Sequence, residues 1–100
     1  MKQSKWTFIR GTSFKKEISW DEIGVTADQV SMVSMAAIMK DGITSVARFN
    51  VEVTYDCLIV RLSASEGSRL KGLHRFNINL ALVEPVGEVV AAAYGYLEAR

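Results

Sequence analysis

The 100-residue sequence contains one cysteine, one histidine and one proline. A disulfide needs two thiols, so Cys57 cannot form a bridge within the chain. One thiol and one imidazole also cannot supply the nitrogen and sulfur ligands of a zinc site. Cys57 precedes the apolar run 58–60, which favours a buried, unreactive thiol. The sequence therefore predicts no metal site and no cofactor.

Residue patterns that support catalysis are also scarce. Nucleophilic catalysis needs a nucleophile, a base and a group that orients the base. The single histidine, His74, alternates in register with Phe76 and Ile78, which favours a hydrogen-bonded side chain at the edge of a core. No spacing pairs two carboxylates in one cleft, and no glycine-rich phosphate-binding motif occurs. We expect no catalytic residues and interpret the chain as a non-enzyme.

Neither sign of charge dominates. The 12 Lys and Arg residues and 11 Asp and Glu residues give a formal net charge of +1. A protein that binds nucleic acid by neutralising phosphates needs a clustered excess of Lys and Arg. The nearest such cluster is Lys15 and Lys16 with Lys2, Lys5 and Arg10 nearby, and a solvated strand face accounts for it. We expect no nucleic-acid partner.

Long hydrophobic runs are missing. A helix that spans a bilayer needs about 20 apolar residues, and the longest apolar runs of this sequence fall well short of that. Residues 1–6 carry positive charges but no apolar stretch follows them, unlike a secretory signal. The sequence predicts a chain that is made in a cytoplasm and has no membrane partner.

The length and the hydrophobic content suit a single domain over residues 1–100. A chain of this size buries roughly two-thirds of the surface that its unfolded form exposes, and 49% of its residues are hydrophobic. Apolar and polar residues alternate, which predicts strands with one buried face. The pattern is clearest over Leu73–Val83, where Phe76, Ile78 and Leu80 point one way. The other alternating segments are 6–9, 14–20, 49–54, 58–63 and the closing run 88–99.

Turn signals separate these segments about every ten residues. They lie at Arg10–Ser13, Lys40–Gly42, Tyr55–Asp56, Ser63–Gly72 and Glu84–Gly87. Asp-Gly pairs favour tight hairpins because both central residues of such a turn need a positive φ. Short strands at this spacing predict an all-β sandwich of about seven strands with hairpin and Greek-key links.

One segment fits two structures. Thr26–Gln29 resembles a helix capping box, and the following Val30–Met39 is rich in Ala and Met, which are good helix formers. The same run read as a strand is apolar on both faces, and the Asp-Gly pair after it favours a strand that enters a hairpin. We expect a turn at Thr26–Gln29 and then a strand, with a helix as the alternative.

The aromatic residues are spread one or two per strand, which is typical of a core between two sheets. Tyr94 and Tyr96 differ because they share one face of the last strand. The other face of that strand carries small residues, which are Ala91, Ala93 and Gly95. Small residues allow another layer to approach closely, whether from this domain or from a neighbouring subunit. Aromatic anchors and edge strands dominate many interfaces, so we expect contacts at Trp6, Tyr94 and Tyr96, on the first and last strands.

A family resemblance covers nearly the whole chain. The segments that carry it are the Arg10–Gly11 turn before Phe14, the run 30–38 closed by Lys40, Asp41 and Gly42, the strand 58–63, the polar stretch ending at 70–72, the strand 73–80, and Gly95 in the last strand. In this order the sequence is similar to the N-terminal domain of phage baseplate upper proteins. Members of that family often read Arg-Gly-Asp-Thr at the first turn, where this chain has Arg10–Ser13.

The resemblance implies an immunoglobulin-like antiparallel β-sandwich. It further implies a structural or adaptor subunit of a tailed-phage virion, at the baseplate, tail or neck, assembled in the host cytoplasm. The partners would be other virion proteins and copies of the chain itself in a homo-oligomer. No fibre-bearing extension follows Arg100, so we expect a short adaptor, collar or decoration subunit. The alternative is a bacterial immunoglobulin-like recognition module that binds a peptide or carbohydrate in an aromatic groove.

Overall fold

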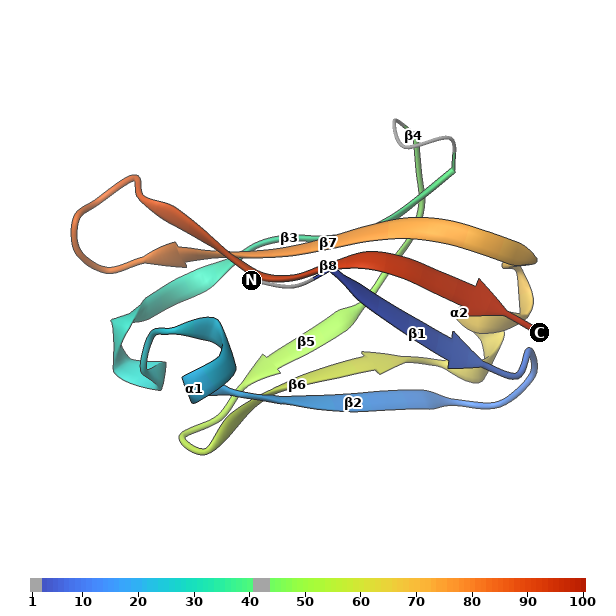
Figure 1. The fold of residues 1–100 in the computed structure, drawn as a ribbon, viewed down its shortest axis with the longest axis horizontal. Coiled ribbons are helices and arrows are strands. Elements are labelled where there is room, and N and C mark those ends of the chain that lie inside the picture. Colours follow the sequence, from blue (N-terminus) through green and yellow to red (C-terminus); the bar gives the residue numbers. More distant parts are fainter. Residues whose placement is uncertain (1–2, 41–43) are drawn as a thin grey trace.

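The computed structural model describes residues 3–40 and 44–100, which form eight strands in two packed sheets with short helical turns at their ends (Figure 1). The strands are β1 (Ser4–Phe8), β2 (Phe14–Ser19), β3 (Val30–Lys40), β4 (Thr44–Arg48), β5 (Asn50–Val53), β6 (Cys57–Leu62), β7 (Gly72–Leu82) and β8 (Val89–Ala99). The helical elements are α1 (Trp20–Ile23), the 3-10 turn η1 (Ala27–Gln29) and α2 (Ala64–Ser68). The predicted mostly-β fold of two packed sheets is confirmed.

The two sheets contain five and three strands. Their orders are β1-β8-β7-β3-β4 and β2-β6-β5. β1 runs parallel to β8, whereas every other pairing among the described strands is antiparallel. The larger sheet is therefore mixed, which corrects the expectation of an antiparallel fold of about seven strands. Parallel neighbours need a long connection, and nearly the whole chain separates β1 from β8.

The ambiguous segment forms a turn and then a strand, as expected. The Gln29 side chain folds back so that its Oε1 accepts a hydrogen bond from the Thr26 backbone N–H at 2.8 Å. The helical turn ends there because Val30 is extended and pairs with Leu82 of β7. Of the predicted hairpin turn at Lys40–Gly42, residues 41 and 42 lie outside the described residues.

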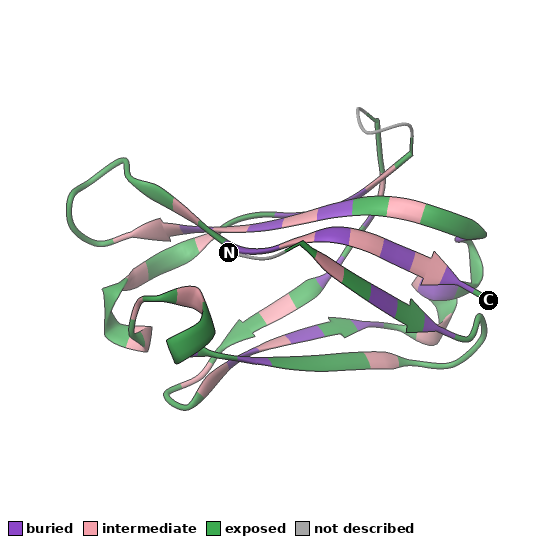
Figure 2. Cartoon of the chain, in the orientation of Figure 1, coloured by how far each residue is buried: buried purple, intermediate pink, exposed green. Residues whose placement is uncertain are grey.

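The core lies between the sheets and consists of side chains from alternate positions of the strands. Buried and more exposed residues alternate along β7 and along the second half of β8 (Figure 2). Trp6 stacks on Phe76 with ring centroids 4.4 Å apart, and Phe49 meets Phe76 edge to face at 5.7 Å. Each fully buried large apolar side chain stabilises the fold by about 1.5–3 kcal/mol. The largest buried side chains are Phe49, Phe76, Ile38, Leu58, Leu62, Ile78, Leu80, Leu97 and Val60.

Another strand of the same chain, β1, packs beside the small residues of β8. A Cβ at Gly95 would overlap the carbonyl oxygen of Ser4 and lie 2.7 Å from its nitrogen, so only glycine fits beside β1. The register of β8 shifts opposite Ile78 and Asn79. This irregularity buries both Ala92 and Ala93 and leaves Ala91 exposed, which corrects the prediction that Ala91 shares a face with Ala93 and Gly95.

Two serines cap short helical turns, although the sequence predicts a strand at Ser19 and a turn at Ser63. The Ser19 hydroxyl accepts a hydrogen bond from the Glu22 N–H at the start of α1, and Ser63 does the same for Glu66 at the start of α2. Such caps satisfy backbone donors that a helix leaves free at its first turn. No helix within the described residues is long and apolar enough to cross a membrane.

Candidate interaction surface

The outer face of the five-stranded sheet points away from the core, and no described helix or strand covers it (Figure 1). We call its central residues the tyrosine face. They are Lys5 and Thr7 of β1, Tyr94 and Tyr96 of β8, Arg75, Asn77 and Asn79 of β7, and Met35, Ala37 and Met39 of β3. The strand register arranges them in rows, so this face is a continuous surface across four strands.

Tyr96 lies in the middle of one row, between Lys5 on β1 and Arg75 on β7. The Arg75 guanidinium carbon lies 5.6 Å from the centre of the Tyr96 ring, and its Nη2 donates to the Tyr96 hydroxyl at 3.4 Å. A cation over an exposed ring contributes about 0.5–1 kcal/mol. Arg75 therefore contacts both the ring and the hydroxyl of the half-buried Tyr96.

Tyr94 lies in the adjacent row, opposite Asn77. In the next row the Asn79 amide nitrogen lies 3.8 Å from the Met35 sulfur, and Met35 is 42% exposed. Tyrosine, methionine and arginine are enriched in the centres of protein interfaces, whereas lysine and glutamate are depleted there. The centre of the tyrosine face, with its tyrosines, methionines and Arg75, is therefore rich in residue types that are enriched at protein contacts, while Lys5 lies on the outermost strand and pairs with Glu98.

The three predicted contact residues lie on two sides of the sheet. Tyr94 and Tyr96 lie together on the tyrosine face, as their spacing predicts. Trp6 points the other way, is 8% exposed and packs in the core on Phe76. Its alternation with Phe8 is the signal for this burial, because the two side chains share one face of β1.

The expected edge strands also need a correction. β1 is the outermost strand of the five-stranded sheet, as expected for the first strand. The last strand, β8, lies between β1 and β7 over residues 95–99 and is therefore not an edge there. The edge of the sheet opposite β1 is β4.

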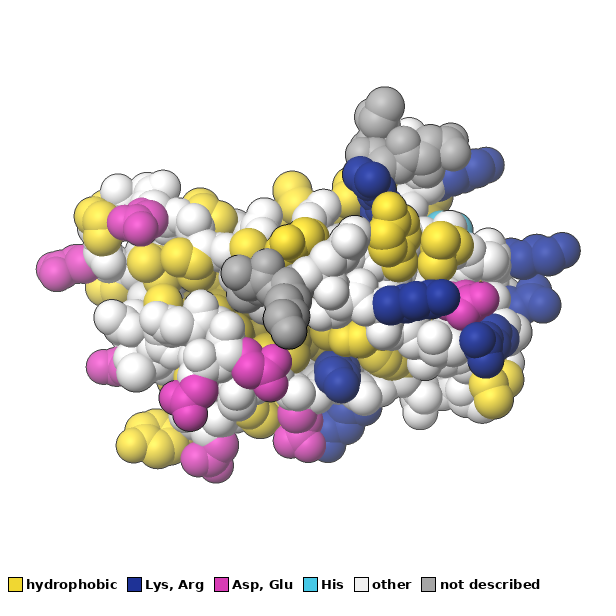
Figure 3. All heavy atoms as spheres, viewed as in Figure 1, with side chains coloured by type: hydrophobic (Ala, Val, Ile, Leu, Met, Phe, Trp, Pro, Cys, Tyr) yellow, Lys and Arg dark blue, Asp and Glu magenta, His cyan; other side chains and the backbone are white. Residues whose placement is uncertain are grey.

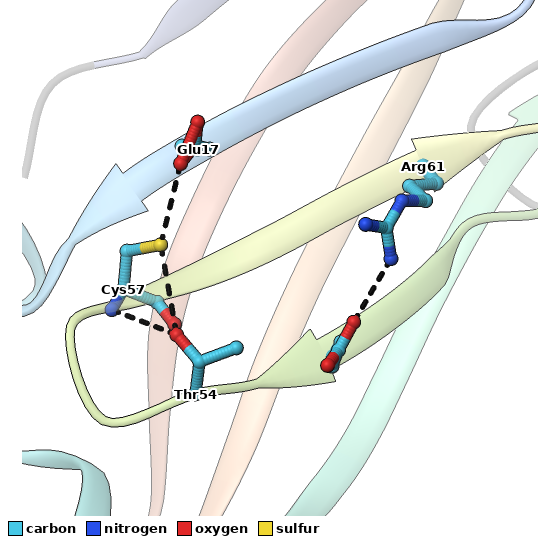
Figure 4. A network of polar contacts seen from close by, with 5 residues as sticks. Glu17, Thr54, Cys57 and Arg61 are labelled. Atoms are coloured by element: carbon cyan, nitrogen blue, oxygen red, sulfur yellow. Dashed lines mark hydrogen bonds and ion pairs between the residues drawn. The ribbon is translucent and has the colours of Figure 1, made fainter.

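The outer side of the three-stranded sheet carries small polar networks. Figure 4 shows Thr54 closing the turn before β6: its hydroxyl donates to the Cys57 carbonyl at 2.7 Å and accepts from the Cys57 N–H at 3.1 Å. The Cys57 thiol lies 3.6 Å from a Glu17 carboxylate oxygen. Cys57 is half-buried, which corrects the prediction of a buried thiol. Arg61 pairs with Glu52 at 2.9 Å on the same side. These contacts hold neighbouring strands and the turn together.

The groups that could support catalysis are dispersed. His74 Nε2 lies 3.1 Å from the Lys71 carbonyl oxygen, in the local hydrogen bond that its position predicts. Over residues 3–40 and 44–100, no three His, Cys, Asp or Glu side chains group in a way that could hold a metal ion. The concave regions of the described surface include a groove of about 680 Å³ near the starts of β2 and α2, a region of about 600 Å³ between β1 and β2, and a cleft of about 330 Å³ between β2 and β8.

Comparison with known proteins gives no relative for this chain: no protein-family model matches its sequence, and a search of curated proteins returns no significant match.

Proposed function

We propose that this chain is a non-enzymatic structural subunit of a tailed-phage virion, with an immunoglobulin-like fold, that binds other virion proteins and copies of itself. The observation that carries the proposal is the tyrosine face, a broad sheet surface with two aromatic rings at its centre and no described element over it. The location in a virion rests on the resemblance of the turn and strand pattern to the N-terminal domain of phage baseplate upper proteins, and no protein-family model matches the chain.

The strand order supports the immunoglobulin-like assignment. In variable-type immunoglobulin domains the second, fifth and fourth conserved strands share one sheet, and the third, sixth and seventh share the other with two added strands, of which this chain has a counterpart of one, β4. The sheet β2-β6-β5 and the run β8-β7-β3-β4 follow that arrangement. β1 then takes the place of the first strand, here paired with the last.

The mechanism we propose is geometric. Preformed strands present Tyr94 and Tyr96 on one surface, and the contact of Arg75 with Tyr96 reduces the side-chain freedom that is lost on docking. Tyrosine supplies a large contact area with a hydrogen-bonding tip. In a symmetric assembly the same modest contact repeats in every copy, and linked contacts reinforce one another.

Incorporation into particles tests the proposal. Phage particles are purified from cells that carry the gene, and the chain is quantified in them by mass spectrometry. We expect several copies per particle for the native chain, and at least a tenfold loss for the double variant Tyr94→Ser, Tyr96→Ser. The matched control is Ile9→Ser, at a 65% exposed apolar residue away from the tyrosine face. Absence of the chain from the particles would refute the proposal.

The recognition-module alternative predicts another result. Tyrosine rings beside Asn77 and Asn79 amides also suit a sugar or an extended peptide. In that case the chain is a monomer by size-exclusion chromatography with light scattering. Titration with an oligosaccharide or peptide then changes tyrosine signals of Tyr94 and Tyr96 saturably. Trp6 and Trp20 are poor reporters because each is 8% exposed.

A further inference from the structure

The near-zero net charge conceals a separation of charge along the molecule. The loops at the end that carries α1 span residues 20–29, 54–56 and 83–88, and they contain acidic residues but no Lys or Arg. These acidic residues are Asp21, Glu22, Asp28, Asp56, Glu84 and Glu88. The opposite end carries mostly basic residues, among them Arg10, Arg69, Lys71 and Arg100. Figure 3 shows acidic side chains mainly on the left of the view and basic ones mainly on the right.

The ion pairs follow the same division. The acidic residues outside those loops are largely neutralised: Glu52 pairs with Arg61, Glu66 with Arg69, and Glu98 with both Lys5 and Arg100. None of the six acidic loop residues has an ion-pair partner within residues 3–40 and 44–100. The acidic end therefore keeps an uncompensated negative field.

The acidic end also presents an apolar projection. The turn between β7 and β8, residues 83–88, which we call the acidic tip, places Val86 between Glu84 and Glu88. Val86 is 91% exposed, and Val83 in the same turn is 49% exposed. An exposed apolar side chain flanked by carboxylates suits a concave partner that is apolar inside and basic at its rim.

The chain itself contains a concave surface with apolar and basic lining residues towards its other end. We call the groove of about 680 Å³ beside α2 the basic groove. Its apolar surface comes from the half-buried Phe14, with Phe49 and Leu62 behind it at 1% and 2% exposed. Its exposed cationic residues are Lys15, Arg48 and Arg61, and its one acidic lining residue, Glu66, is paired with Arg69. Arg61 is paired with Glu52, whereas Lys15 and Arg48 have no ion pair among the described residues.

We propose that a second copy of this chain docks head to tail, with the acidic tip of one copy in the basic groove of the next. This inference deepens the proposed function, on which it rests, by naming the partner and the contact. The tip and the groove are different patches towards opposite ends of a molecule 38 Å long. In the head-to-tail arrangement that we propose, each copy offers its tip to one neighbour and its groove to another, so the contact is heterologous. Heterologous contacts repeat from copy to copy and give rings or filaments rather than closed dimers.

Charge exchange tests the contact directly. The tip variant is Glu84→Lys, Glu88→Lys, and the groove variant is Lys15→Glu, Arg48→Glu. We expect the wild type to self-associate at about 20 mM salt and to dissociate near 0.5 M, because the Debye length becomes short. Each variant alone should associate at least about tenfold more weakly, since like charges then face each other. An equimolar mixture should recover association, because every tip again meets a groove of opposite charge.

Sedimentation velocity measures these equilibria, with circular dichroism to verify the fold of each variant. The control is Asp21→Lys, an acidic-end change outside the tip, which should leave the association constant within about twofold. A monomeric wild type at low salt, or a mixture of variants that stays monomeric, would overturn the inference. If the tyrosine-face variant is still lost from particles in that case, the proposed function stands. If copies associate head to tail but the chain is absent from particles, the proposed function is refuted while the head-to-tail contact stands.

Discussion

Replacing Gly95 by alanine should detach the first strand from the sheet. Gly95 has a φ of +148°, which side chains rarely adopt, and it faces the backbone of Ser4 across the β1–β8 pairing. An alanine Cβ would lie 2.7 Å from the Ser4 nitrogen and overlap its carbonyl oxygen. Neither group is the end of a flexible side chain, so β1 itself has to move.

Two contributions set the magnitude. A non-glycine residue in such a sparsely populated backbone region costs about 1–3 kcal/mol. Moving β1 also disturbs Trp6 and Phe8, which are buried, and complete loss of one such side chain costs about 3–5 kcal/mol. We therefore expect Gly95→Ala to lower the free energy of unfolding by about 4 kcal/mol.

Urea unfolding followed by tryptophan fluorescence measures this change. The matched control is Gly72→Ala: Gly72 has a φ of +80°, but a Cβ there would meet nothing within 4 Å. The control should lose only about 1–2 kcal/mol, the cost of a left-handed conformation. If the two variants differ by less than about 1 kcal/mol, β1 is not held against Gly95 in the way described.

Three further substitutions test other parts of the fold in the same urea assay. Leu97→Ala, at a fully buried position, should cost about 2–5 kcal/mol, and a loss below 1 kcal/mol would contradict its place in the core. Trp20→Phe removes the indole N–H that donates to the Thr54 carbonyl at 3.0 Å, so we expect a loss of about 1–2 kcal/mol. Glu52→Gln removes only the exposed pair with Arg61 and should change stability by no more than about 0.5 kcal/mol, so a larger loss would refute a minor surface role.

The sequence predicts which faces of the strands are buried better than it predicts which strands are neighbours. Alternation identifies the buried side chains of β7 because a period of two follows from strand geometry alone. It carries no information on pairing partners, so the parallel pairing of β1 with β8 could not be predicted from it. The one local trace of that pairing is Gly95, whose missing side chain makes room for Ser4.

Alternation likewise predicts the faces of the strands at the candidate surface but not which strands lie side by side there. The spacing of Tyr94 and Tyr96 predicts a shared face, and the structure places both on the outer side of the sheet. Arg75 reaches Tyr96 from another strand, and only the register brings them together. Residue type alone predicts that Trp6 is a contact like the two tyrosines, whereas its alternation with Phe8 indicates burial. The role of Tyr94 and Tyr96 as contacts stays a prediction.

Net charge and charge arrangement constrain association in different ways. A net charge of +1 argues against phosphate binding, and it also means that copies of the chain repel each other little at long range. Carboxylates at one end, and Lys15 and Arg48 towards the other, have no ion pair among the described residues, and they then favour one relative orientation of two copies. A balanced composition scattered evenly over the surface would give no such preference. The orienting effect therefore comes from the fold, which gathers acidic residues from three separate loops at one end of the sandwich.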